Sequence, residues 1–253
     1  MSMEKPANNH KVVFITGSSS GIGEQTAYLF AAHGDSLVLT YHRYKDEGDV
    51  VAAKCSSLGA KNVLLIHLDL TDNESIVNAV KSAIAEYSCL DILINNAAFL
   101  AQAILTEQSF ENIRLQIKTN LEGPIKITKE CLPYIQESII NIGSNLSTVG
   151  QKQFTVYSAT KFGIRGLTKS LALEFPNLRI FTVNPSLTAT KMGHFKGLPP
   201  ATVAKVVYRA ALGDYQEKSG ADINVRDYLY GPQLKRYWIF IRWLKHQLWK
   251  LKF

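Results

Sequence analysis

The sequence predicts an α/β protein made of a single doubly wound domain, in which helices cover both faces of a parallel sheet. Three observations support this prediction. Short apolar segments rich in Val, Ile and Leu alternate with helix-like segments from residue 11 onward. The connections between these apolar segments are long enough to hold a helix, which favours parallel pairing of strands. A glycine-rich turn joins the first apolar segment to the first helical one.

The expected elements follow this alternation. About seven strands are predicted, over residues 11–16, 36–41, 62–68, 91–94, 138–142, 178–183 and 221–225. Helices are predicted over residues 21–33, 46–58, 72–87, 107–136, 156–175 and 201–212. The fourth of these helices should be interrupted near Gly123-Pro124, and Thr71 with Glu74 has the spacing of a capping box at the start of the third.

Length and composition exclude several classes of protein. The chain has 253 residues, of which 46% are hydrophobic and 19% charged, so it can build a large core and is not intrinsically disordered. No apolar run approaches the roughly 18 residues that span a bilayer, and residues 1–11 lack the apolar region of a signal peptide. The three scattered cysteines, Cys55, Cys89 and Cys131, favour a reducing cytoplasm.

The positive charge is concentrated at the C-terminus. The net charge is +7, and residues 235–253 contribute +6 of it without any Asp or Glu. The first 234 residues therefore carry only +1, which argues against a nucleic-acid-binding body. A nucleic-acid binder that uses the basic tail is a separate hypothesis, which a salt-dependent gel shift comparing full-length protein with residues 1–230 would test.

Two regions are therefore expected: a domain over residues 1–230 and an extension over residues 231–253. The extension has the pattern of an amphipathic helix with cations opposite an apolar stripe. The stripe consists of Tyr237, Phe240, Ile241, Leu244, Leu248 and Leu251. It could pack on the body of the protein or on a second subunit, or it could lie on a membrane surface.

The glycine-rich turn is the first candidate site. Gly17, Gly21 and Gly23 permit a tight turn and a close backbone approach at the start of a helix. The free N–H groups at a helix N-terminus attract a phosphate. The spacing is G-x-x-x-G-x-G, and no Walker lysine follows, which argues against a nucleoside triphosphatase.

A tyrosine–lysine pair forms the second candidate site. Tyr157 and Lys161 are four residues apart, so they share one face of a predicted helix. A nearby ammonium favours the phenolate, which makes a tyrosine usable as an acid or base. Ser144 ends a predicted strand thirteen residues upstream, where its hydroxyl could bind a substrate oxygen.

Taken together with further motifs, these features resemble the short-chain dehydrogenase/reductase family over about residues 10 to 225. The motifs, in chain order, are the glycine turn, Asp69, Asn95 to Ala98, Asn120, Ser144, Tyr157, Lys161, Asn184-Pro185 and Thr190. The resemblance implies a Rossmann-type sheet of order 3-2-1-4-5-6-7, a nicotinamide cofactor and hydride transfer. The chain departs from the family pattern at Ala98 and Ser186, where glycine is usual, and in its basic C-terminal segment.

The resemblance also implies roles for matching residues. Tyr157 exchanges the proton of the substrate oxygen, and Lys161 lowers the pKa of this tyrosine and binds the nicotinamide ribose. Ser144 polarises the carbonyl, and Asn120 holds a water that links Lys161 to solvent. The implied cofactor-binding residues are Gly17, Ser19, Ser20, Gly21, Ile22, Gly23, His42, Arg43, Asp69, Leu70, Asn96, Ala97, Tyr157, Lys161, Pro185, Thr188 and Thr190.

The end of the second strand predicts NADP(H) as the cofactor. An NAD enzyme needs an acid there for the ribose 2′-hydroxyl, but Tyr41, His42 and Arg43 precede the first acid, Asp46. Arg43 can instead bind a 2′-phosphate, although it could also be a solvated loop cation. The stretch is similar to that of pteridine reductases. A pteridine substrate does not follow, because those enzymes have Asp where Ser144 stands.

The substrate pocket is expected to be apolar and open. Its apolar residues should be Phe99, Leu100, Leu146, Leu187 and Phe195. Asn145 and Gln151 could line it or serve loop structure, and His194 could touch substrate or be solvated. The loop over residues 188–200 is short, which favours an open pocket. The six histidines have no ligand spacing, so no metal is expected.

The predicted function is that of an NADP(H)-dependent oxidoreductase acting on a carbonyl or secondary alcohol. A non-catalytic NADP-binding regulator on the same fold is the alternative, which a turnover assay would distinguish. The expected partners are a small, apolar substrate and a second copy of the chain, with no nucleic acid. The homodimer should form through residues 107–136 and 156–175, with Phe162, Leu167 and Leu171 at its face. The expected location is cytoplasmic, with peripheral membrane contact as the alternative for residues 235–253.

Overall fold

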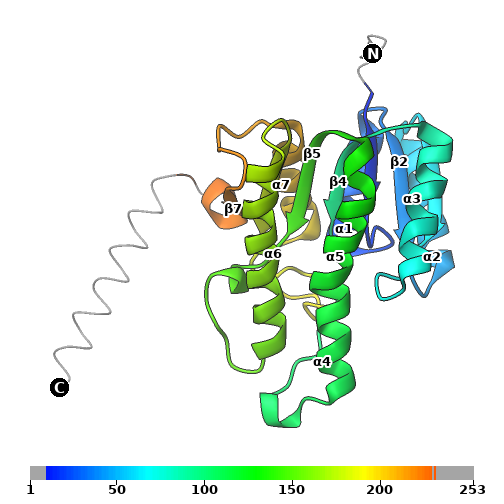
Figure 1. Ribbon diagram of the computed structural model, residues 1–253. Helices are drawn as coiled ribbons and strands as arrows, with labels where there is room; N and C mark the ends of the chain where they lie inside the picture. The colour runs from blue at the N-terminus through cyan, green and yellow to red at the C-terminus, as the bar shows by residue number, and fades with distance from the viewer. Residues whose placement is uncertain (1–9, 230, 232–253) are drawn as a thin grey trace.

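The computed structural model describes residues 10–229 and 231, and it contains the predicted parallel sheet (Figure 1). Seven parallel strands are arranged in the order β3-β2-β1-β4-β5-β6-β7, which confirms the predicted order. The strands are β1 (Val12–Ile15), β2 (Ser36–Tyr41), β3 (Asn62–His67), β4 (Leu90–Asn95), β5 (Ile135–Ile142), β6 (Arg179–Asn184) and β7 (Asp222–Asn224). Each lies within three residues of its predicted limits.

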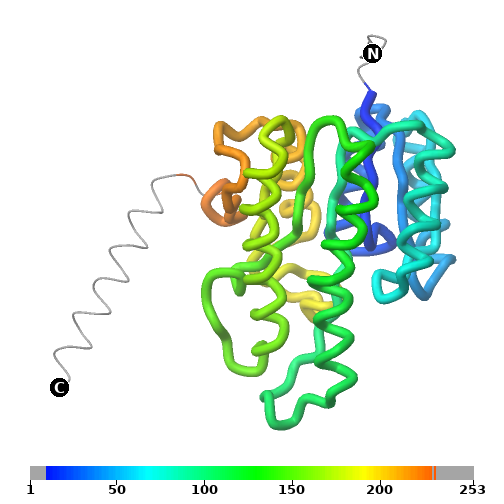
Figure 2. The backbone as a smooth tube through the Cα atoms, in the orientation of Figure 1, coloured from blue at the N-terminus to red at the C-terminus, as the bar shows by residue number. Residues whose placement is uncertain are grey.

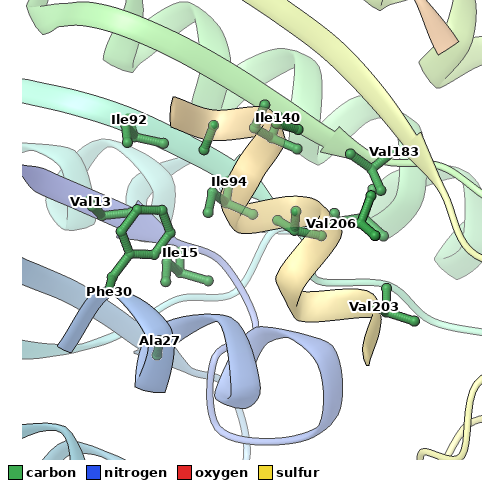
Figure 3. Close-up of a cluster of buried hydrophobic side chains, with 14 of the residues drawn as sticks. Val13, Ile15, Ala27, Phe30, Ile92, Ile94, Ile140, Val183, Val203 and Val206 are labelled. Atoms are coloured by element: carbon green, nitrogen blue, oxygen red, sulfur yellow. The ribbon is translucent and has the colours of Figure 1, made fainter. Parts of the chain in front are cut away.

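Helices α1 (Gly21–Ala32), α2 (Lys45–Leu58) and α7 (Pro200–Leu212) cover one face of the sheet. Figure 3 shows this core, in which Phe30 of α1 and Val206 of α7 pack over Val13 and Ile15 of β1 and neighbouring strands. Successive strand residues point to opposite faces, so Phe14, which lies between these two β1 residues, belongs to the other core.

The opposite face is covered by α3 (Asn73–Tyr87), α5 (Gly123–Cys131) and α6 (Thr155–Glu174). Ile76 of α3, Ile127 of α5 and Leu171 of α6 belong to the same core as Phe14. A further helix, α4 (Phe110–Ile117), precedes α5 and extends beyond the sheet (Figure 1). Helices on both faces confirm the doubly wound arrangement.

The predicted helix over residues 107–136 is wrong in its detail. A 3₁₀ turn (Leu105–Glu107) precedes α4, and a π-helical segment (Lys118–Glu122) separates α4 from α5. The interruption therefore lies before Gly123-Pro124, where α5 instead begins, because a first-turn proline loses no helical hydrogen bond. A second 3₁₀ turn (Leu132–Tyr134) ends the helical stretch, and residues 135–136 belong to β5.

The predicted capping box at Thr71 is also wrong. The N-cap of α3 is Asp72, whose carboxylate accepts hydrogen bonds from the backbone N–H groups of Glu74 and Ser75, each at 3.2 Å. The Thr71 hydroxyl instead donates to Asp69 Oδ1 at 2.8 Å. A carboxylate one residue further along thus takes the cap position and leaves Thr71 to orient Asp69.

The residues expected at a dimer face separate into two groups. On α6, Phe162 is 44% exposed, whereas Leu171 is buried in the core and Leu167 packs against that core. The prediction for Leu167 and Leu171 is therefore wrong, because the 3.6-residue period turns them toward the sheet. Phe110 of α4 and Leu173 of α6 are the more exposed apolar side chains, at 92% and 84%.

The loops that follow β1, β4, β5 and β6 gather at one end of the sheet, since the strands are parallel (Figure 2). None of the helices in the described part of the chain is long and apolar enough to cross a membrane. The predicted C-terminal helix over residues 231–253 lies, apart from Gly231, outside the described residues.

Candidate active site

A cavity of about 610 Å³ opens at the carboxyl ends of the strands. This is where doubly wound folds bind their ligands, and the volume is within the range of small-molecule sites. The sequence-predicted residues that line it are Gly17, Ser19, Ser20, Gly21, Ile22, His42, Asn96, Ala97, Ser144, Tyr157, Lys161, Pro185, Thr188 and Thr190. They come from six separate parts of the chain.

Five predicted residues do not line this cavity: Gly23, Arg43, Asp69, Leu70 and Asn120. Leu70 is buried in the core beneath α3, and Arg43 is exposed beyond the end of β2. Asp69 lies behind His42, with 3.4 Å between its Oδ2 and the His42 Nε2. Gly23 has a packing role, because a Cβ there would lie 2.4 Å from the Gly17 carbonyl oxygen.

The turn between β1 and α1 has the shape of a phosphate cradle. Gly17 and Gly21 adopt left-handed φ values of 63° and 64°, which favour glycine. Ser20 is the N-cap of α1, yet its side chain makes no capping hydrogen bond. The Gly21 N–H instead donates to Glu24 Oε2 at 3.2 Å, so Ser20 caps none of the first N–H groups of α1, at a helix end that attracts anions.

Asn96 and Thr16 brace this turn against the end of β4. The Asn96 side-chain amide donates to the carbonyl oxygens of Thr16 and Gly17 at 3.0 and 2.9 Å. The Thr16 hydroxyl accepts from the backbone N–H groups of Asn96 and Ala97 at 2.9 and 3.0 Å. These four hydrogen bonds hold the turn rigidly open, so the residues present fit the diphosphate of a dinucleotide cofactor.

Ser144, Tyr157 and Lys161 meet on one wall of the cavity, as the sequence predicted. Ser144 follows β5, and its backbone N–H donates to Asn184 Oδ1 at 3.1 Å. Tyr157 and Lys161 lie on successive turns of α6, with the Lys161 Nζ 5.5 Å from the centroid of the tyrosine ring. The same Nζ donates to the Ile142 carbonyl oxygen at 2.7 Å.

The ionisation of these groups is set mainly by burial. Burial raises the pKa of Tyr157 to about 12, while a hydrogen bond with Ser144 acts to lower it. Burial lowers the pKa of Lys161 to about 8. The influence that opposes burial at the phenol comes from Ser144. The expectation that Lys161 lowers the tyrosine pKa stays a prediction.

Asn120 lies in the π-helical segment behind the cavity. Its side-chain amide donates to the Phe99 carbonyl oxygen at 2.7 Å, and its Oδ1 accepts from the Phe99 N–H at 2.7 Å. π-helical turns are frequent at functional sites. The side chain thus clamps the loop that follows β4, and the water-holding role implied by the resemblance stays a prediction.

The other half of the cavity is largely apolar. Of the five expected apolar residues, Leu100, Leu146 and Leu187 line it, whereas Phe99 and the exposed Phe195 do not. Asn145, Gln151 and His194 also line it. Sequence reasoning missed Gln102, Phe154 and Met192. Phe154 carried a signal, since it lies one helical turn before Tyr157, and their rings meet edge-on with centroids 6.5 Å apart.

Ser186, where the family pattern has glycine, also lines the cavity. Its hydroxyl is buried and has no hydrogen-bond partner within the described residues. A buried polar atom without a partner is rare in folded proteins, so a ligand of this cavity has a hydroxyl available to it. Nowhere in the described part of the chain do three His, Cys, Asp or Glu side chains gather as a metal site would require.

Comparison with known proteins agrees with this architecture. A family model described as short chain dehydrogenase matches residues 11–198. Trans-4-hydroxycyclohexanecarboxylate dehydrogenase of Sinomonas cyclohexanicum is 34% identical over 192 residues, which are 72% of this chain and 74% of the relative. A 3-oxoacyl-(acyl-carrier-protein) reductase of Thermotoga maritima is 31% identical over 211 residues, which are 81% of this chain and 84% of the relative.

Solved structures show the same fold. An alcohol dehydrogenase from the archaeon Thermococcus sibiricus, complexed with 5-hydroxy-NADP, superposes with a TM-score of 0.78 at 26% sequence identity. The match covers 85% of this chain and 96% of that one. The family model alone spans most of the chain and includes the glycine turn, Ser144, Tyr157 and Lys161. The chain belongs to the short-chain dehydrogenase/reductase family.

Proposed function

We propose that this protein is an NADP(H)-dependent oxidoreductase that interconverts a carbonyl and a secondary alcohol. The observation that carries the proposal is the meeting of Ser144, Tyr157 and Lys161 on one wall of the same cavity that the glycine turn enters. A proton donor, a second hydroxyl and a phosphate cradle are the parts that carbonyl reduction with a dinucleotide needs.

In carbonyl reduction, different residues of the chain bind the cofactor, bind the substrate oxygen and donate the proton. When bound, the nicotinamide supplies the hydride, and Gly17, Ser19, Ser20, Gly21 and Ile22 hold the diphosphate. The substrate oxygen lies between Ser144 and Tyr157, where the Ser144 hydroxyl donates a hydrogen bond to it. Tyr157, whose pKa of about 12 keeps it protonated at neutral pH, gives its proton to the developing alkoxide.

Lys161 supports this chemistry from the buried side of the cavity. Its ammonium is available to ribose hydroxyls at the level of Tyr157, and its pKa of about 8 keeps it mostly protonated at neutral pH. In the oxidation direction the steps reverse: the Tyr157 phenolate takes the proton of the substrate alcohol. Ser144 favours that direction as well, because its hydrogen bond stabilises the phenolate.

The proposed preference for NADP(H) rests on the residues after β2. No acidic residue lies between the end of β2 and Asp46. His42 lines the cavity, and the exposed Arg43 is the cation available for a 2′-phosphate. Arg43→Ala should weaken NADPH binding by about 1.5–3 kcal/mol and leave NADH binding nearly unchanged. Arg226→Ala, which removes an exposed arginine outside the cavity, is the control. Equal losses for both cofactors, or tighter binding of NADH than NADPH by the wild type, would refute the preference.

The substrate is proposed to be small and apolar, because Leu100, Leu146, Phe154 and Leu187 line its half of the cavity. A panel of ketones, aldehydes, acyl thioesters, steroids and sugars with NADPH should reveal turnover. Tyr157→Phe should then lose about 100-fold or more of that turnover while binding NADPH normally. A variant that turns over at the wild-type rate on the identified substrate would rule out this catalytic assignment.

The assembly and location are proposed from exposure and from cysteine chemistry. We propose a homodimer through α4, α5 and α6, because exposed apolar side chains such as Phe110, Phe162 and Leu173 lie on these helices. Single exposed apolar residues are normal, so this surface is proposed from several of them on helices that contact one another. A reducing, cytoplasmic location is proposed because Cys55, Cys89 and Cys131 are all free.

A further inference from the structure

Lys191 is a cation at the rim of the cavity to which the family pattern assigns no role. It lies in the loop after β6, between Thr190 and Met192, and all three residues line the cavity. Its Nζ lies 2.6 Å from Glu47 Oε1, on the first turn of α2. The pair therefore joins the cavity-lining loop after β6 to α2, which is 144 residues away in the sequence.

The position of Lys191 is next to the phosphate cradle. Thr190 contacts the glycine turn so closely that a Cβ on Gly21 would lie 2.9 Å from its Cγ2. On the other side, α2 begins two residues after Arg43, where a 2′-phosphate would be expected. The ion pair thus joins the loop beside the phosphate cradle to the helix that follows Arg43.

Few positively charged side chains line the cavity, so few are available to bind an anion. Within the described residues, the lysines and arginines that line the cavity are Lys161 and Lys191, with no arginine among them. Lys161 is buried and already donates to the Ile142 carbonyl oxygen at the end of β5. The side chains of Lys191 and Glu47 are 62% and 38% exposed, so breaking their pair costs little. A phosphate at hydrogen-bonding distance offers an ammonium a stronger partner than an exposed carboxylate does.

We propose that Lys191 binds a phosphate of the dinucleotide cofactor, and that Glu47 competes with this phosphate for the Lys191 ammonium. In the cofactor-free protein Lys191 is paired with Glu47, and on binding it turns from Glu47 to the phosphate. The inference rests on the proposed function only in requiring a dinucleotide; it does not depend on the substrate. Its distinctive consequence is that removal of the two partners has opposite effects on cofactor affinity.

The test is calorimetric titration of the full-length protein with NADPH and with NADH, without substrate. Lys191→Met should raise the dissociation constant by at least about fivefold, since it removes a charge-assisted hydrogen bond. Glu47→Gln should lower the dissociation constant by about two- to fivefold, the range of an exposed ion pair. In the double variant the Glu47→Gln gain should vanish, because the ammonium for which Glu47 and the phosphate compete is gone.

Two matched controls separate direct contacts from overall charge. Lys196→Met removes an exposed cation from the same loop, and Asp46→Asn removes an exposed carboxylate from the same turn of α2. Both should leave the dissociation constants within about twofold of the wild type, because a solvated charge is screened within roughly 8–10 Å. Thermal unfolding of each variant checks that the exposed substitutions leave the fold intact.

The two cofactors distinguish the phosphate that is bound. A loss in Lys191→Met that is equal for NADH and NADPH assigns Lys191 to the diphosphate, and a loss confined to NADPH assigns it to the 2′-phosphate. The proposal is overturned if Lys191→Met binds both cofactors as tightly as Lys196→Met does. It is also overturned if Glu47→Gln weakens binding, because the ion pair would then support cofactor binding by holding the loop after β6 against α2. A wild type that binds neither cofactor would refute the proposed function itself.

Discussion

The ammonium of Lys161 donates a hydrogen bond to the carbonyl oxygen of Ile142 at 2.7 Å, from the middle of α6 to the last residue of β5. Both residues are nearly inaccessible, with 3% and 6% of their surfaces exposed. One carbonyl replaces only part of the hydration that the ammonium loses, so burial lowers the pKa of Lys161 to about 8. The cation is thus held at the reaction site at the expense of stability.

Replacement of Lys161 by Met should therefore stabilise the protein at pH 7. The folded-state pKa of about 8 lies below the ordinary 10.5, so folding disfavours the charged form. That destabilisation is fully present below about pH 8, fades as the pH rises, and is absent above about pH 10.5. We expect Lys161→Met to raise the free energy of unfolding by about 2 kcal/mol at pH 7, because about 1.4 kcal/mol applies per pKa unit and the Ile142 carbonyl loses its donor.

Urea unfolding at pH 7 and pH 10 measures this effect. The difference between wild type and variant should shrink at the higher pH, and turnover should be lost at both. Lys152→Met, at an exposed position outside the cavity, should change stability by less than about 0.5 kcal/mol. A Lys161→Met protein that is less stable than wild type at pH 7 would show that the ammonium is not destabilising.

Removal of the Ser144 hydroxyl should shift the pH profile of alcohol oxidation. Oxidation needs the Tyr157 phenolate, and the Ser144 hydrogen bond lowers the pKa of that phenol against the effect of burial. In Ser144→Ala the pKa should rise further. The plateau of kcat/KM should then lie at a higher pH, and rates at pH 8 should be lower by about 10- to 100-fold because less phenolate is present.

The comparison with Ser144→Thr separates the hydroxyl from the shape of the site. Threonine keeps the hydroxyl and should return the profile toward that of the wild type. The measurement is kcat/KM for the alcohol between pH 7 and pH 11. Equal kcat/KM values for wild type and Ser144→Ala at every pH would show that Ser144 does not influence ionisation of Tyr157.

Asn120 should prove to be a residue of structural importance. Its side chain satisfies both the N–H and the carbonyl oxygen of Phe99, and it is 1% exposed. Asn120→Ala leaves two buried backbone groups without partners, each worth about 1–3 kcal/mol. We expect the free energy of unfolding to fall by about 2–4 kcal/mol. Asn78→Ala, on the exposed side of α3, should change it by less than about 0.5 kcal/mol.

Most element limits could be predicted from the sequence because each strand is a local pattern, whereas the order of the strands followed from the resemblance to the family. In β1, Val13 and Ile15 face one core and Phe14 the other, as alternation requires. The π-helical segment Lys118–Glu122 could not be predicted, since the side-chain pattern does not distinguish i+4 from i+5 hydrogen bonding. The cap of α3 could not either, because Thr71 and Asp72 are both good capping residues.

The candidate site divides in the same way. Motif positions such as Ser144 and Tyr157 could be placed from the sequence, because consecutive strands and one helix face determine where they lie. The hydrogen-bond partner of Lys161 could not be predicted, since the torsion angles of a long side chain determine which carbonyl oxygen its ammonium reaches. The lining residue Met192 and the exposed Phe195 depend on the path of an irregular loop, which no periodic pattern describes.

A charged residue at Phe162 should separate the proposed homodimer. Phe162 is 44% exposed on α6 and lies on the surface shared with α4 and α5. In a two-fold dimer each substitution acts twice, and burial of one phenyl ring contributes about 1.5–3 kcal/mol. Phe162→Glu should therefore raise the dimer dissociation constant by at least about 100-fold, since 1.4 kcal/mol corresponds to tenfold.

Light scattering at micromolar concentration checks this prediction, with the wild type expected at twice the mass of the chain. The matched control is Val50→Glu, which places the same charge on α2, on the opposite face of the sheet, at a residue that is 68% exposed. It should remain dimeric. A monomeric wild type would refute the dimer. A dimeric Phe162→Glu protein would place the interface elsewhere and leave the exposed ring of Phe162 facing solvent.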